Sequence, residues 1–269
     1  MDTNFKNDSN KLSENGIRQF LKSNTDRKII IFDEVTSTNT LAKELLKSEL
    51  DGAMLLSEKQ TAGRGRMGRS FFSPDGSGIY MSIGLKPKIA AEKSVLITVA
   101  AAVAVSRALD LMFGVDTEIK WVNDIYYKGK KVCGILTEAV FENESGKILN
   151  AVLGIGINVN MPKGGFPEDI KDKAGAISSA DHISRNRIAA EVVNQFDMIY
   201  KDLETAEFLE EYRKKSCLIG KKVLVMPIHN EQYYAVVKDI DEKAQLVVKT
   251  EGGRVLALSG GEVSIVPEL

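Results

Sequence analysis

Residues 60–69 read QTAGRGRMGR, and this is the most informative segment of the chain. Its glycines allow a close backbone approach to a ligand or a positive φ. Its arginines, whose planar donor groups suit phosphate oxygens, are Arg64, Arg66 and Arg69. Neither Gly-Lys-Ser/Thr nor an immediate helix follows, so the segment departs from the P-loop and dinucleotide templates. It predicts a phosphate-handling loop, although the spacing alone leaves open a solvated or RNA-binding arginine–glycine tract.

The segments on both sides of this loop alternate between strand and helix patterns. Residues 61–78 predict a long mobile loop. The expected strands are 28–35, 53–60, 79–85, 117–122, 132–141 and 148–157, with a hairpin turn at Lys128–Gly129. The expected helices are 92–113, about 184–203, 205–215 and one that starts at Ser37 or Thr38 and buries Leu41, Leu45 and Leu46. This mixture predicts an α+β fold in which helices pack on a mixed sheet.

The chain divides into three parts. Residues 1–27 are rich in Asn, Ser, Asp and Lys, and they predict a tail or a short helix. Residues 28–216 form the main α+β domain. Residues 217–269 follow an all-β pattern with Gly-Gly and charged turns, which predicts a small five-stranded SH3-like β-barrel.

The composition excludes several classes of protein. Hydrophobic residues make up 43% and charged residues 27% of the 269 residues, as in ordinary globular proteins. With 36 Lys and Arg against 37 Asp and Glu, the net charge of −1 offers no global basic field to nucleic acid or an anionic membrane. The apolar run 95–105 is too short to span a bilayer, and the polar N-terminus carries no secretory signal. Two separated cysteines indicate neither a disulfide framework nor a zinc site, so we expect a cytoplasmic protein.

Four further segments accompany the arginine-rich loop. They are 34–39 (EVTSTN), 120–124 (KWVND), 130–138 (KKVCGILTE) and 154–160 (GIGINVN). Each is weak alone, but together and in this order they resemble the biotin–protein ligase family, and the resemblance covers nearly everything from Lys28 to Ile265. It implies a class II aminoacyl-tRNA synthetase-like catalytic core in residues 28–216 and a form without an N-terminal DNA-binding domain.

The resemblance implies a ligase that uses ATP and Mg²⁺ to join biotin to a lysine of a biotin carboxyl carrier domain. The acceptor is part of a biotin-dependent carboxylase such as acetyl-CoA carboxylase, and the intermediate is biotinyl-5'-AMP. No covalent enzyme nucleophile is needed, so positioning and electrostatic stabilisation carry the rate. The implied catalytic residues are Lys131, near the biotin carboxylate, and Arg66. The alternative for Lys131 is that it has no catalytic role and lies with Lys128 and Lys130 in a solvent-exposed hairpin.

The resemblance also implies the binding residues. The biotin-binding set is Ser37, Thr38, Asn39, Gln60, Gly63, Arg64, Gly65, Arg66 and Lys131. The ATP-binding set is Arg66, Arg69, Phe71, Lys120, Asn123, Asp124 and Asn158, and Asp124 is also the candidate Mg²⁺ ligand. Tyr80 and Ser82 border the pocket. Cys133, on the same predicted strand face as Lys131, lies either in the pocket wall or, more simply, in the core.

The sequence departs from the family at two positions. Val122 stands where the family commonly has proline, and this removes a fixed φ before Asn123. Phe71 stands where some members carry tryptophan near the adenine, which keeps an aromatic face but loses area and an indole donor.

Two alternatives to a biotin ligase remain open. A lipoate or octanoate ligase would share the core, but those acids lack the ureido ring that Ser37, Thr38 and Gln60 suit. A nucleic-acid-binding, biotin-responsive regulator would need a recognition helix, which residues 1–27 do not offer. We therefore expect biotin, ATP and a carrier domain as partners, no DNA and no membrane, with a homodimer as the oligomeric state to test.

Overall fold

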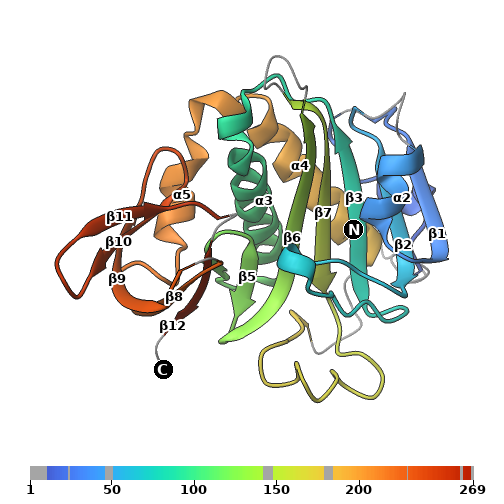
Figure 1. Cartoon of the computed structure of the whole chain (residues 1–269). Coiled ribbons are helices and arrows are strands. Elements are labelled where there is room, and N and C mark those ends of the chain that lie inside the picture. The colour runs from blue at the N-terminus through green and yellow to red at the C-terminus, as the bar shows by residue number, and fades with distance from the viewer. Residues whose placement is uncertain are drawn as a thin grey trace.

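A mixed sheet dominates the computed structural model, which describes residues 11–23, 25–45, 51–141, 148–178, 184–228, 230–260 and 263–267. Its seven strands lie in the order β1-β2-β3-β7-β6-β5-β4 (Figure 1). They are β1 (Ile29–Val35), β2 (Met54–Gln60), β3 (Gly78–Leu85), β4 (Glu118–Lys120), β5 (Asp124–Tyr127), β6 (Lys130–Phe141) and β7 (Ile148–Asn158). The β1–β2 pair is parallel and the other neighbours are antiparallel. The predicted α+β class is therefore confirmed.

Helices cover both faces of this sheet. They are α1 (Glu14–Arg18), α2 (Thr38–Leu45), α3 (Val95–Phe113), α4 (Arg185–Tyr200) and α5 (Phe208–Lys214). Thr98 on α3 donates to the Thr137 hydroxyl on β6 at 2.8 Å, whereas Asn39 on α2 donates to the carboxylate of the next residue, Glu138, at 2.9 Å. Because successive strand residues point to opposite faces, α2 and α3 lie on opposite sides of the sheet.

The central helix α3 forms the core on its side of the sheet. Its Ala-rich surface lets it approach the strands closely, and most of its residues are buried. It ends at Gly114, whose φ of 64° gives the left-handed cap that glycine favours. With the turn before it, this helix is long and apolar enough to cross a membrane by composition, but it is mostly buried within the fold.

The described part of the predicted tail is a short helix that packs as part of the main core. Leu12, Ile17 and Leu21 are buried. Two asparagines of α4 hold the backbone on either side of α1: Asn186 accepts from Ser13 N, and Asn194 accepts from Lys22 N, both at 2.8 Å. Residues 11–23 are thus fastened to α4 by apolar burial and by backbone hydrogen bonds.

A second, antiparallel sheet forms the C-terminal part. Its order is β11-β10-β9-β8-β12, built from β8 (Lys222–Pro227), β9 (Tyr233–Ile240), β10 (Leu246–Thr250), β11 (Val255–Leu258) and β12 (Val263–Pro267). Figure 1 shows it beside β5 and α5. Trp121, which follows β4, donates from Nε1 to the Ala244 carbonyl at 2.9 Å and so connects the two sheets. The five predicted strands are confirmed and are compatible with a small barrel-like domain.

The predicted apolar face of α2 is wrong. Leu45 is 51% exposed and Leu41 is half-buried, while Leu46 lies outside the described residues. The buried face of α2 instead consists of Thr38, Asn39 and Ala42. Polar residues point inward here because polar partners on β2 and β3 receive them.

Candidate active site

The turn from β1 into α2 places three polar residues in the interior. Leu41 N donates to the Ser37 carbonyl at 3.0 Å, which starts the helix, and Ser37, Thr38 and Asn39 are all buried. Ser82 Oγ on β3 lies 2.8 Å from Thr38 Oγ1 and 2.6 Å from Asn39 Oδ1. The Ser37 hydroxyl has no hydrogen-bond partner within the described part of the chain. It is therefore available to a ligand.

Gln60 fixes this polar set to the end of β2. Its Oε1 accepts from Thr38 N at 2.9 Å and lies 3.2 Å from Thr38 Oγ1, while its Nε2 donates to Ser73 Oγ at 2.8 Å. Both ends of the carboxamide are thus used by the protein. Ser73, which sequence reasoning did not single out, fixes the orientation of Gln60.

Three glycines, Gly134, Gly154 and Gly156, form a floor on the face of the sheet that α2 covers, and the side chains of Asn39 and Phe71 lie on it. In the register of β6 and β7, Gly134 pairs with Gly156 and Leu136 pairs with Gly154. A Cβ atom added at Gly154 would lie 2.3 Å from Asn39 Oδ1, and one at Gly156 would lie 2.5 Å from Phe71 Cε1. Only glycine lets these side chains lie so close to the strands. The Gly-x-Gly-x-Asn motif therefore belongs to the strand whose backbone forms this glycine floor.

The arginine loop, residues 61–77, crosses in front of β6 and β7 (Figure 1). Gly65 N donates to Arg69 O at 2.7 Å, Phe71 N to Gly63 O at 2.8 Å, and Gln60 N to Ser73 O at 3.0 Å. Gly63 must be glycine, because a Cβ atom there would lie 2.4 Å from the Phe71 carbonyl. The loop thus has a defined, hairpin-like conformation in this structure.

The arginines of the loop point to different partners. Arg66 Nη1 donates to Asn123 Oδ1 at 2.9 Å, and burial lowers the pKa of Arg66 although Asp124 opposes the shift. Arg64 Nη2 lies 3.4 Å from Glu138 Oε1, and Arg69 is exposed. The loop therefore contacts the sheet at two places, near Glu138 and near Asp124.

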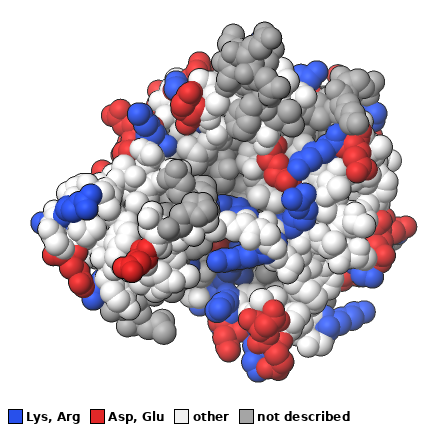
Figure 2. Space-filling view, in the orientation of Figure 1, with Lys and Arg blue, Asp and Glu red and all other residues white. Residues whose placement is uncertain are grey.

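Asp124 lies among four cations. Lys131 Nζ is 2.7 Å from Asp124 Oδ1. Burial lowers the pKa of Lys120, Asp124 raises it, and the charges of Lys131 and Arg69 lower it further. Arg66, Arg69, Lys120 and Lys131 thus form a basic cluster around one carboxylate. Figure 2 shows Lys and Arg side chains gathered in a hollow between the two sheets, where a polyanion would be attracted.

Asp124 alone does not form a metal site. Within the described ranges, no three His, Cys, Asp or Glu residues come together as a ligand group. The carboxylate is also paired with Lys131. Because Mg²⁺ commonly takes one or two carboxylates together with substrate phosphates, these residues do not fit a cation held by protein alone.

Asn158 lies at the end of β7, paired with Gly78 on β3. Its Nδ2 donates to the Gly175 carbonyl at 3.0 Å, and its own carbonyl accepts from Ile177 N at 3.0 Å. The same segment contacts Lys131, whose N donates to Lys173 O at 2.8 Å. Asn158 and Lys131 therefore share residues 173–177 as a support.

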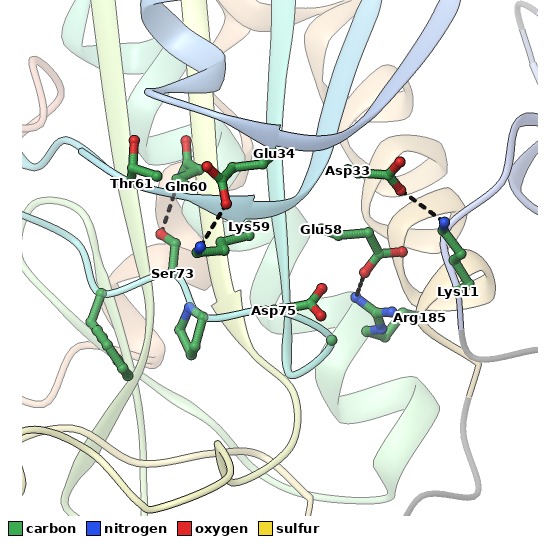
Figure 3. A pocket seen from close by; sticks show the side chains of 13 residues that line it. Lys11, Asp33, Glu34, Glu58, Lys59, Gln60, Thr61, Ser73, Asp75 and Arg185 are labelled. Atoms are coloured by element: carbon green, nitrogen blue, oxygen red, sulfur yellow. Dashed lines mark hydrogen bonds and ion pairs between the residues drawn. The ribbon is translucent and has the colours of Figure 1, made fainter.

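A cavity of about 1060 Å³ lies outside the predicted site and shares only Gln60 with it. Three ion pairs line it, as Figure 3 shows: Lys11–Asp33 at 2.8 Å, Lys59–Glu34 at 2.6 Å and Arg185–Glu58 at 2.7 Å. Its charges are mostly neutralised within the protein. Most of the predicted residues lie elsewhere: in the polar pocket formed by Ser37, Thr38, Asn39 and Gln60, on the glycine floor, or in the basic cluster.

Comparisons with known proteins point to one family. Residues 31–158 match the model of the Biotin/lipoate A/B protein ligase family. The chain is 36% identical over 250 residues to the Bifunctional ligase/repressor BirA of Bacillus spizizenii, covering 90% of this chain and 76% of that protein. It is 29% identical over 254 residues to the Biotin--[acetyl-CoA-carboxylase] ligase of Mycobacterium tuberculosis, covering 88% of each.

Solved structures lead to the same family. The biotin protein ligase from Aquifex aeolicus, in complex with biotin and ATP, superposes with a TM-score of 0.74 at 27% identity, covering 90% of this chain and 99% of that one. The two folds therefore match over most of the length of both chains. The chain belongs to the biotin protein ligase family.

Proposed function

We propose that this protein attaches biotin to a lysine of a biotin carboxyl carrier domain, using ATP and passing through biotinyl-5'-AMP. As a member of its family it is an enzyme that forms an amide bond at the expense of ATP. One observation supports the assignment of residues: the Lys131 ammonium lies 3.2 Å from the position of a Cβ at Gly134, on the glycine floor, and it is also a member of the basic cluster around Asp124. A carboxylate on the floor and a phosphate on the cluster would meet beside it.

Biotin binds over the glycine floor. The free Ser37 hydroxyl is the first candidate to pair with the ureido ring, which has two N–H donors and one C=O acceptor. Thr38, Asn39 and Gln60 shape the pocket around it through the bonds that hold them rigid. Arg64 and the backbone of Gly63 and Gly65 close the pocket from the loop side.

ATP binds over the basic cluster. Arg66, Arg69 and Lys120 neutralise its phosphates, and Asn123 holds Arg66 in place. The Phe71 ring, which lies against Gly134 and Gly156, offers an aromatic face to the adenine, and Asn158 borders the same end of β7. Mg²⁺ would be bound together with the ATP phosphates, whose charge it would neutralise, and the Asp124 carboxylate is the candidate protein ligand.

Two transfers then occur in one site: an adenylyl transfer to biotin and an acyl transfer to the acceptor. A carboxylate oxygen of biotin attacks the α-phosphorus, the bond to the bridging oxygen of the β-phosphate breaks, and pyrophosphate leaves. The acceptor amine next attacks the carbonyl carbon, the bond to the AMP oxygen breaks, and the nitrogen loses a proton. Lys131 orients the carboxylate in the first step and stabilises developing charge in both, while Arg66 stabilises the phosphate.

Other features of the proposal concern the context of the reaction. The protein works in the cytoplasm, which agrees with the free thiols of Cys133 and Cys217.

It does not read DNA through residues 1–27, because residues 11–23 pack on α4. Gel-shift measurements with duplex DNA test this, and a sequence-specific shift by the isolated protein would contradict it. The homodimer stays a prediction, and sedimentation equilibrium with and without biotin and ATP tests it.

The acceptor experiment tests the assignment directly. The protein is incubated with biotin, ATP, Mg²⁺ and a carrier domain of a biotin-dependent carboxylase, and the carrier is analysed by intact mass. We expect one added biotinyl group. A carrier variant with arginine at the acceptor lysine is the control and should stay unmodified. Modification of neither carrier would contradict the proposed function.

A further inference from the structure

Glu138 on β6 is a shared acceptor for two separate elements of the site. Its side chain is 18% exposed. Its Oε2 accepts from Asn39 Nδ2 at 2.9 Å, and its Oε1 accepts from Lys43 Nζ at 2.5 Å. The same Oε1 lies 3.4 Å from Arg64 Nη2. One carboxylate thus joins α2, which carries the polar pocket, to the arginine loop.

These neighbours keep the carboxylate charged. Burial by itself raises the pKa of Glu138, but hydrogen bonds from Lys43 and Asn39 and the charges of Lys43 and Arg64 together hold that pKa below its usual value. The group is therefore ionised at neutral pH and acts only as an acceptor. Because it can only accept, it requires that the NH₂ end of Asn39 points toward it.

The orientation of Asn39 follows from this requirement. Its Nδ2 donates to Glu138 and also to the Leu136 carbonyl at 3.2 Å, while its Oδ1 lies 2.6 Å from Ser82 Oγ. The carboxamide is fixed at both ends, directly above the place where Gly154 lacks a side chain. Loss of the Glu138 charge would loosen one wall of the polar pocket.

The position of the arginine loop depends on the same carboxylate. Arg64 reaches Glu138, and two residues later Arg66 reaches Asn123 beside Asp124. The loop is therefore held at two points, one beside the polar pocket and one beside the basic cluster. Releasing the first point would let the loop open at its pocket end while Arg66 stayed in place.

We propose that Glu138 is a positioning residue that couples the arginine loop to the biotin pocket, so that a correctly oriented Asn39 and a closed loop depend on one carboxylate. It touches no reacting atom and acts through Asn39 and Arg64. This inference rests on the proposed function.

A double-mutant cycle tests it, with Glu138→Gln, Arg64→Met and the double variant. Glu34→Gln is the matched control, because its carboxylate pairs with Lys59 at 2.6 Å outside the proposed binding sets. Two quantities are measured in the full chain: the equilibrium constant for biotin by calorimetry, and the rate at which preformed biotinyl-AMP is lost in a chase. Melting temperatures report separately on folding.

We expect Glu138→Gln to weaken biotin binding and to speed adenylate loss, each by about tenfold, as for loss of a charge-assisted hydrogen bond. In the double variant, adenylate loss should be no faster than in the faster single variant, because both changes break one link. The control should match wild type. Unchanged biotin affinity in Glu138→Gln, or rate effects that multiply in the double variant, would overturn the inference.

Two further comparisons keep the test decisive. If Glu138→Gln does not fold, Arg64→Met should still speed adenylate loss, whereas Lys43→Met, which removes a partner outside the loop, should not; equal effects of the two would overturn the inference. A wild-type protein that forms no biotinyl-AMP would contradict the proposed function instead. If the wild type forms biotinyl-AMP but has the same biotin affinity and the same rate of adenylate loss as Glu138→Gln, only the proposed coupling is contradicted.

Discussion

Lys131 Nζ lies 2.7 Å from Asp124 Oδ1 across the β5–β6 pair. A β-bulge makes this contact, because the register shifts so that Ile125 pairs with Cys133 but Tyr126 pairs with Lys131. The shift turns the Lys131 side chain onto the glycine floor beside Gly134. A lysine held by a carboxylate in this way is already oriented when a second carboxylate, that of biotin, arrives.

Replacing Lys131 with Ala should slow formation of biotinyl-AMP about tenfold or more, because a charge-assisted contact worth roughly 1.5–3 kcal/mol is lost. Single-turnover kinetics at saturating biotin and ATP measure this. Lys128→Asn is the matched control, since it removes a charge from the same hairpin and asparagine tolerates the φ of 49° at that position. Equal rates for Lys131→Ala and the control would remove Lys131 from the site.

Replacing Arg66 with Gly should weaken retention of biotinyl-AMP more than it weakens its formation. The guanidinium is one of the two points at which the arginine loop is held, through Asn123 at 2.9 Å. A loop released there admits water and lets the mixed anhydride escape, so bystander lysines should become labelled. The dissociation rate of preformed adenylate and the protease sensitivity of residues 61–77 report on this. Identical dissociation rates in variant and wild type would contradict it.

Replacing Gly156 with Ala should displace the Phe71 ring, because the new Cβ would lie 2.5 Å from Phe71 Cε1. Overpacking of this kind costs about 1–3 kcal/mol, and here part of the cost appears as weaker ATP binding. Gly252→Ala is the control, since its Cβ would meet nothing closer than Thr250 Oγ1 at 3.9 Å. Nucleotide titration compares the two variants. An unchanged ATP affinity in Gly156→Ala would show that the ring does not border the nucleotide.

Replacing Arg185 with Met should destabilise the fold by about 3–5 kcal/mol, because it leaves Glu58 charged and buried without its cation. The two side chains are 3% and 5% exposed and 2.7 Å apart, and Glu58 also accepts from Leu12 N at 2.6 Å. Urea denaturation measures the change in free energy of unfolding. A second change, Glu58→Gln, should recover part of the loss in the double variant. If the double variant loses more free energy of unfolding than the two single variants lose together, the result would argue against the pairing.

Much of the fold follows from local patterns in the sequence. Continuous β-branched runs predict β1 and the strands of the C-terminal sheet, and the turn at Lys128–Gly129 appears where both residues have positive φ. Leu45 shows where patterning fails. Periodicity assigns it to the buried face of α2, yet Thr38 and Asn39 occupy that face because Ser82 and Gln60 supply polar partners from other strands. A helical pattern cannot reveal partners that are distant in sequence.

The candidate site, like the fold, could be predicted from the sequence only in part. The structure brings Arg66, Asp124 and Lys131 together and places Asn39 beside Glu138. The binding and catalytic roles that the resemblance implies for these residues stay predictions. Cys133 lies in the core, which was the simpler of the two expectations for it, and burial raises the pKa of its thiol. The expectation that Cys133 shares a face with Lys131 is wrong, because the β-bulge turns Lys131 to the other face. Glu138 closes one of the quoted motifs, but its role emerges only when α2 and the arginine loop are both in place.

The most direct test of the central claim is the identity of the acyl-adenylate that the protein makes. The purified chain is incubated with ATP, Mg²⁺ and equal amounts of biotin, lipoate and octanoate, and the products are identified by mass. The polar pocket of Ser37, Thr38 and Asn39 above the glycine floor predicts biotinyl-AMP with release of pyrophosphate. A preference for lipoyl-AMP or octanoyl-AMP would contradict the account.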